Sequence, residues 1–133
     1  MKKENTLKVA QIGAGSFGRK RAESVQQCKS AELLAVADAN METASESAKA
    51  LGVKALSLKE VFDNSEIDIV TIATPNIHHS ELACTAMRAG KHVLCEKPVA
   101  RNALEALEIL KTSKKTGKLV KVGSNHRYFS SVI

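Results

Sequence analysis

The stretch "VAQIGAGSFG", residues 9–18, joins a short apolar run to three glycines in the spacing G-x-G-x-x-G. The apolar residues before Gly13 predict a buried strand, and the glycine loop opens a predicted helix. Gly13 permits a tight turn, Gly15 leaves the backbone open to close approach, and Gly18 lets the helix pack closely on the strand. The stretch therefore predicts a strand, a sharp loop and a helix in immediate succession.

The rest of the chain repeats this alternation of strand and helix. Apolar runs predict strands at 7–12, 32–37, 53–56, 67–73, 92–96 and 119–123, of which 53–56 is the weakest. Helical periods between them include 44–51, 58–63, 76–89 and the leucine stripe Leu104, Leu107 and Leu110. Strands that alternate with helices and are apolar throughout predict a doubly wound parallel α/β sheet, the Rossmann fold, with about six strands and flanking helices.

Length and composition are those of an ordinary globular domain. The chain has 133 residues, 44% of them hydrophobic and 26% charged, which predicts one domain. It contains no apolar run near the roughly 18 residues that span a membrane, and Met1 to Asn5 lack the apolar core of a signal peptide. Three widely spaced cysteines fit reduced thiols rather than disulfides or zinc. We therefore expect a cytoplasmic protein with no metal site and no membrane partner.

The net charge of +6 raises the question of nucleic-acid binding. Many of the cations have another explanation: Lys111, Lys114 and Lys115 precede Gly117, where the last turn of a helix favours positive charge. Only four aromatic residues are present, too few for a base-stacking platform. The sequence therefore argues against a nucleic-acid partner.

An acid completes the pattern that begins with the glycines. Asp38 ends the second predicted strand, 20 residues beyond Gly18. A strand, glycine loop, helix, strand and acid in this order form the dinucleotide-binding fingerprint, in which the acid holds the adenosine ribose. Asp38 would repel a 2′-phosphate, and no Arg or Lys follows it in "DANMETASES", so NAD is favoured over NADP. The alternative is a flexible loop with an unrelated acid in a turn.

Polar residues also follow the later strands. "TPNIHH" (74–79) follows the fourth, "EKP" (96–98) the fifth and "SNHRY" (124–128) the sixth. The carboxyl ends of parallel strands lie along one edge of a sheet, where ligands bind. We therefore expect Glu96 and Lys97 at the reactive end of a cofactor groove rather than in a solvated turn.

Together, "GAGSFG", "ATPNIHH", "CEKPVA" and "VGSNHRYF" resemble the dinucleotide-binding half of the Gfo/Idh/MocA family of oxidoreductases. The resemblance covers essentially the whole chain, and the combination of T-P-N-x-x-H with E-K-P is more specific than the glycine loop. It implies a pyridine-nucleotide oxidoreductase that acts on a sugar, a cyclitol or a related polyol.

The resemblance also assigns roles to individual residues. Lys97 would be catalytic and reach toward the substrate hydroxyl, after a Lys-Pro peptide that is often cis in this family. Glu96 would bind the nicotinamide-side ribose. The full cofactor-binding set that it implies is Gly13, Gly15, Ser16, Phe17, Gly18, Asp38, Thr74, Pro75, Asn76, His79, Glu96 and Lys97. For His79 a structural hydrogen bond is an equally good expectation.

The chain departs from the family pattern at its end. Members continue into a second domain that covers the nicotinamide, often supplies a catalytic histidine and usually forms the homo-oligomer interface. We therefore expect residues 1–123 to form an NAD(P)-binding Rossmann domain and 124–133 to begin the connection to a C-terminal substrate domain, absent because the sequence is truncated. A natural stand-alone domain is the alternative.

Three functions fit these observations. The first is the dinucleotide-binding half of a dehydrogenase. The second is a non-catalytic NAD-binding sensor or assembly module, which would have no use for Lys97 in an active site. The third is a relative that uses NAD transiently in glycoside cleavage or epimerisation.

Overall fold

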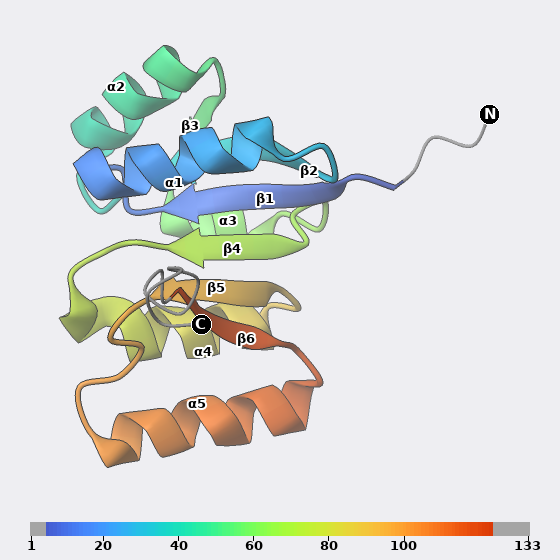
Figure 1. Cartoon of the computed structure of the whole chain (residues 1–133), viewed down its shortest axis with the longest axis vertical. Coiled ribbons are helices and arrows are strands. Elements are labelled where there is room, and N and C mark those ends of the chain that lie inside the picture. The colour runs from blue at the N-terminus through green and yellow to red at the C-terminus, as the bar shows by residue number, and fades with distance from the viewer. Residues whose placement is uncertain (1–4, 124–133) are drawn as a thin grey trace, which may run out of the picture.

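The computed structural model describes residues 5–123 of the chain. In this range six parallel strands form one sheet in the order β3-β2-β1-β4-β5-β6 (Figure 1). The strands are β1 Leu7–Ile12, β2 Ala31–Ala37, β3 Lys54–Leu56, β4 Ile69–Ile72, β5 His92–Glu96 and β6 Val120–Gly123. The order progresses outward from β1 on one side and from β4 on the other. This confirms the predicted doubly wound sheet and places its switch point between β1 and β4.

Helices connect the strands and cover the sheet. They are α1 Ser16–Gln27, α2 Met41–Leu51, α3 Leu58–Asp63, the short 3₁₀ helix η1 Asn76–His78, α4 His79–Arg88 and α5 Ala103–Thr116. In Figure 1, α1 and α2 lie in front of the sheet and α3 and α4 behind it, while α5 packs against α4. Because crossovers between parallel strands are right-handed, reversing the direction of strand addition moves the helices to the opposite face.

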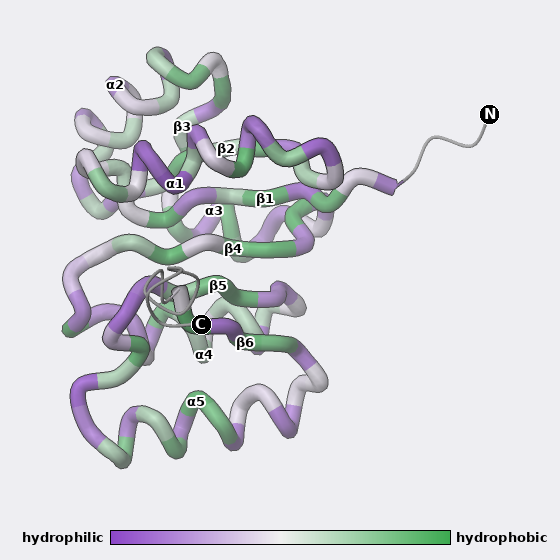
Figure 2. Tube along the Cα trace, viewed as in Figure 1, coloured by the Kyte–Doolittle hydropathy of each residue, from purple (hydrophilic) through white to green (hydrophobic). Residues whose placement is uncertain are grey.

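The core consists of the central strands and the helix faces that cover them. Ile12, Val70, Ile72 and Val93 are each 3% exposed or less and pack with Met87 of α4. Figure 2 shows hydrophobic residues concentrated along β1, β4 and β5. This distribution fits the continuous apolar runs of the central strands, most of whose residues are buried.

Polar caps fix the helix ends. The Asn40 side chain accepts hydrogen bonds from the backbone N–H groups of Glu42 and Thr43, and Gly52 ends α2 in the left-handed conformation. The Asn102 side chain accepts from Glu105 N–H at the start of α5. The Glu105 carboxylate binds the backbone and guanidinium of Arg101, and these hydrogen bonds lower the pKa of Glu105. Asn40 and Asn102 are thus side-chain N-caps of the usual kind.

The structure corrects one detail of the sequence-based prediction. Leu104, Leu107 and Leu110 are 79%, 45% and 50% exposed, so the leucine stripe is not the buried face of α5. That helix buries Ile109 and Thr112 instead, because it packs mainly on α4 and presents its leucines outward.

The three thiols differ in accessibility, which yields a test of the fold. Cys28 is exposed, whereas Cys84 and Cys95 are 2% and 0% exposed, and burial raises the pKa of the Cys95 thiol to about 12. We expect iodoacetamide at pH 8 to add one group to the native chain, at Cys28, and three groups after unfolding in guanidinium chloride. Intact-mass and peptide mass spectrometry measure this. Rapid native modification of Cys95 would contradict the packing of β5.

Candidate functional site

The carboxyl edge of the sheet brings together the loops that the sequence singles out. The loops after β1 and β4 start side by side, since Ala73 N–H donates to Ile12 C=O at 2.8 Å. The β1 loop is also tied to β2 through a hydrogen bond from Gly13 N–H to Ala37 C=O, again at 2.8 Å. The predicted site residues on these loops therefore lie along one edge, at the switch point of the sheet.

The three glycines of the loop meet different constraints. Gly13 has φ +97°, and a Cβ there would lie 2.5 Å from Ala73 O. A Cβ on Gly18 would lie 1.9 Å from Gly13 O. Gly15 has φ −68°, and a Cβ there would meet nothing within 4 Å. The fold thus requires Gly13 and Gly18, whereas Gly15 leaves open space at the start of α1, where a ligand can approach the backbone.

A buried pair of polar side chains forms hydrogen bonds beside the glycine loop. Gln11 is fully buried, and its Nε2 donates to the carbonyls of Ile12 and Gly13, both at 3.2 Å. Its Oε1 accepts the hydroxyl of Thr71, which is also buried, on β4. The sequence analysis missed both residues. A glutamine and a threonine inside otherwise apolar strands were the available signal, because buried polar groups need partners.

Asp38 lies at the end of β2, beside the glycine loop. Its Oδ2 accepts the N–H of Ala14 at 2.8 Å, and its Oδ1 accepts the N–H of Asn40 at 2.9 Å. The carboxylate therefore fixes the loop as well as the start of α2. Each carboxylate oxygen has more than one acceptor position, so Asp38 can also accept hydroxyl groups of a ribose.

The second half of the site is a hollow of about 450 Å³. Its lining comes from α1, the β4 loop and the β5 loop, and consists of Phe17, Ala73, Thr74, Asn76, His79, Glu96, Lys97 and Pro98. Six of these are predicted site residues that lie far apart in the sequence. Phe17 also stands next to Ser16 and Gly18 of the glycine loop, so the hollow continues the space above that loop.

His79 joins the two loops that line the hollow. The side chain is 2% exposed, with Nδ1 2.8 Å from Pro98 O and Nε2 2.8 Å from Thr74 O. Carbonyl oxygens can only accept, so both ring nitrogens face acceptors and neither is left for a ligand. The geometry favours the structural expectation for His79, in which the ring lines the hollow and holds its two walls together.

Glu96 and Lys97 are adjacent in the chain but differ in environment. Glu96 is 9% exposed and its Oε1 pairs with the guanidinium of Arg21 on α1. Lys97 is exposed, lines the hollow and precedes Pro98 in a cis peptide bond. Within residues 5–123, Lys97 forms no ion pair with Glu96, so its ammonium group is available to a ligand in the hollow.

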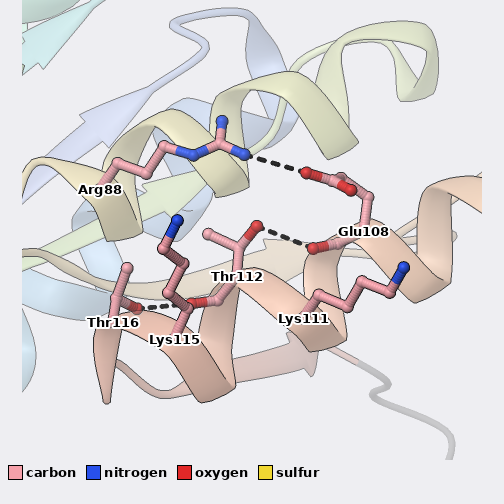
Figure 3. A pocket seen from close by; sticks show the side chains of 6 residues that line it. All are labelled: Arg88, Glu108, Lys111, Thr112, Lys115 and Thr116. Atoms are coloured by element: carbon pink, nitrogen blue, oxygen red, sulfur yellow. Dashed lines mark hydrogen bonds and ion pairs between the residues drawn. The ribbon is translucent and has the colours of Figure 1, made fainter.

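A second hollow of the described region, between α4 and α5, has fewer free polar groups. It is drawn in Figure 3 and is lined by Arg88, Glu108, Lys111, Thr112, Lys115 and Thr116. Arg88 pairs with Glu108 at 2.9 Å, and the two threonine hydroxyls bond to carbonyls of their own helix. No cluster of three potential metal ligands occurs in the described part of the chain. None of its helices is long and apolar enough to cross a membrane.

The doubly wound sheet, the glycine loop and Asp38 define the class: a dinucleotide-binding Rossmann domain. Residues 7–124 match the family model GFO_IDH_MocA, described as "Oxidoreductase family, NAD-binding Rossmann fold", and the chain belongs to this family. The family membership predicted from the sequence motifs is thereby confirmed. Asn125 and Arg127, the polar residues after the last strand, lie outside the described residues.

Several relatives of known or proposed activity are similar to the chain. Glucose-6-phosphate 3-dehydrogenase of Bacillus subtilis is 39% identical over 94% of this chain and 35% of the relative. Inositol 2-dehydrogenase of Rhizobium meliloti is 34% identical over 92% of this chain and 37% of the relative. The structure of myo-inositol 2-dehydrogenase from Lactobacillus plantarum superposes with a TM-score of 0.85 at 29% identity, over 95% of this chain and 38% of that one. The chain thus spans little more than a third of each relative.

The contrast between Gly15 and Gly18 predicts two different mutant phenotypes. Gly15→Val should keep the fold, with at most about 1 kcal/mol lost at the helix cap, and should abolish NAD binding by filling the open space. Gly18→Ala should instead lower the free energy of unfolding by about 1–3 kcal/mol or more, because its Cβ meets backbone. Urea unfolding and titration calorimetry measure these effects. A folded Gly15→Val chain that binds NAD normally would contradict the phosphate role of the loop.

Proposed function

We propose that this chain is the dinucleotide-binding part of a longer NAD-dependent dehydrogenase that oxidises a hydroxyl group of a sugar, cyclitol or related polyol. The observation that carries the proposal is the hollow beside Phe17, in which Lys97 lies free of ion pairs within the described region. A binding module without catalysis needs the glycine loop and Asp38, but it has no need of a lysine at this point.

The groove fits a dinucleotide from end to end. The N–H groups that open α1 have no intrahelical partner and can bind a diphosphate above Gly15. Asp38 receives the hydroxyls of the adenosine ribose at one end, and Glu96 those of the second ribose at the other. The hollow that Thr74 and Lys97 help to line would then hold the nicotinamide.

The chemistry requires a hydride acceptor and a proton acceptor. The bound cofactor supplies the first at C4 of its nicotinamide ring. Lys97 supplies the second: it takes the proton of the substrate hydroxyl as the carbon–oxygen double bond forms. By family resemblance, a histidine from the region that the relatives have in addition assists this proton transfer.

The substrate class follows from the relatives. Glucose-6-phosphate 3-dehydrogenase, inositol 2-dehydrogenase and levoglucosan dehydrogenase are each named for a polyhydroxylated ring compound. These names support a sugar or cyclitol substrate for the longer protein. Three free thiols support a location in the cytoplasm, and the family resemblance supports a homo-oligomer.

Cofactor preference tests the role of Asp38. The chain should bind NAD at least about tenfold more tightly than NADP, because the carboxylate meets the 2′-phosphate with like charge. Asp38→Asn should narrow this difference, whereas Asp63→Asn, an exposed acid on α3, should leave it unchanged. Titration calorimetry with both cofactors measures the ratio. Equal affinities in the unsubstituted chain would contradict the assignment.

Turnover tests the role of Lys97. In the longer protein, Lys97→Ala should lower kcat by about 10² to 10⁴, the usual effect of losing an acid-base group, with little change in NAD affinity. Lys114→Ala, on the exposed face of α5, is the matched control and should retain turnover. Steady-state kinetics with the sugar or cyclitol substrate measure both. Near-normal turnover of Lys97→Ala would return Lys97 to the role of a surface charge.

A further inference from the structure

Arg21 connects the two halves of the site. It comes from the second turn of α1, the helix that the glycine loop opens, and its guanidinium pairs with Oε1 of Glu96 at the end of β5. The same guanidinium lies 5.7 Å from the centroid of the Phe17 ring. Arg21 therefore contacts both Phe17 of the glycine loop and the Glu96 carboxylate.

The Glu96 carboxylate has little freedom apart from this contact. A Cβ on Gly123, at the facing position of β6, would lie 3.1 Å from each of its oxygens, so the β6 backbone closes that side. The carboxylate is also largely removed from water, and a buried negative charge needs a compensating cation. Arg21 supplies that cation from the side of α1.

The pairing leaves part of the carboxylate free. One nitrogen of the guanidinium approaches Oε1, and no partner for Oε2 occurs within residues 5–123. The nearest alternative cation in the sequence is Lys97, which directly follows Glu96. Without Arg21, Lys97 and water are the partners that the described residues leave to the carboxylate, and turning toward either would move it from its position beside the hollow.

We propose that Arg21 is a positioning residue for the nicotinamide-side half of the cofactor: it holds the Glu96 carboxylate where Oε2 accepts a hydroxyl of the second ribose, and it keeps Glu96 away from Lys97. This inference rests on the proposed function. A purely structural ion pair is the alternative, and it would affect stability or all ligands equally.

Two ligands distinguish these roles in the 133-residue chain. ADP occupies only the adenosine and diphosphate part of the groove, whereas NAD also needs the second ribose. Arg21→Met should weaken NAD binding about tenfold, the cost of losing one hydrogen bond to a charged group, while ADP affinity stays within about twofold. Arg88→Met is the matched control: it removes the exposed pair with Glu108, drawn in Figure 3, and should change neither affinity.

A double-mutant cycle tests whether Arg21 acts through Glu96. Glu96→Gln should weaken NAD binding on its own, and Arg21→Met combined with Glu96→Gln should be no weaker than Glu96→Gln alone. Titration calorimetry measures each affinity, and circular dichroism checks each fold. If Arg21→Met does not fold, Arg21→Lys takes its place in the experiment. It should lower the affinity for NAD about threefold and leave the affinity for ADP unchanged.

The outcomes separate the two levels of inference. The positioning role is supported if Arg21→Met weakens the binding of NAD but not of ADP, and if its effect does not add to that of Glu96→Gln. Equal losses for NAD and ADP, no loss for either, or additive losses in the double variant would overturn it while leaving the proposed function intact. If the unsubstituted chain bound neither ligand, the proposed function would fail first and this inference with it.

Discussion

Everything at the carboxyl edge depends on a backbone crossing that has no room for a side chain. After β1, the turn at Gly13 packs against Ala73 at the end of β4. The first turn of α1 then packs against the Gly13 turn at Gly18. A Cβ on Gly13 would strike Ala73 O, and one on Gly18 would strike Gly13 O. This close approach sets the direction of α1, so that the helix presents its N-terminus to the edge and its second turn to β5. Arg21 reaches Glu96 only because α1 runs in this direction.

The two halves of the groove are held by different kinds of interaction. On the proposed adenosine side, backbone groups dominate: Gly13 N–H donates to Ala37 of β2, and Ala14 N–H donates to Asp38. On the proposed nicotinamide side, side chains bridge separate elements, with His79 between two loops and Glu96 paired with Arg21. Each contact of that second kind depends on a single side chain, so one substitution tests it.

The sequence predicted those parts of this arrangement that have a local signature. Apolar runs marked every strand, and β1 and β5 coincide with their predicted ranges. The glycine spacing and the acid at position 38 are fixed by backbone geometry at one place, so they too were readable. Parallel pairing then brought the loops together without any further information, since all strands end at the same edge.

Residues whose role depends on a distant partner could not be predicted in the same way. Arg21 reads as one of three consecutive cations on a helix, and only its ion pair in the folded structure shows that it faces Glu96 at the end of β5. The prediction for the leucines of α5 was wrong because helical periodicity identifies an apolar face but not the neighbour that covers it. In the structure, α4 packs against a different face of α5. Local sequence patterns therefore predict the glycine loop and the strand ends. The side-chain contacts of the site, such as that of Arg21 with Glu96, follow only from which elements the topology places in contact.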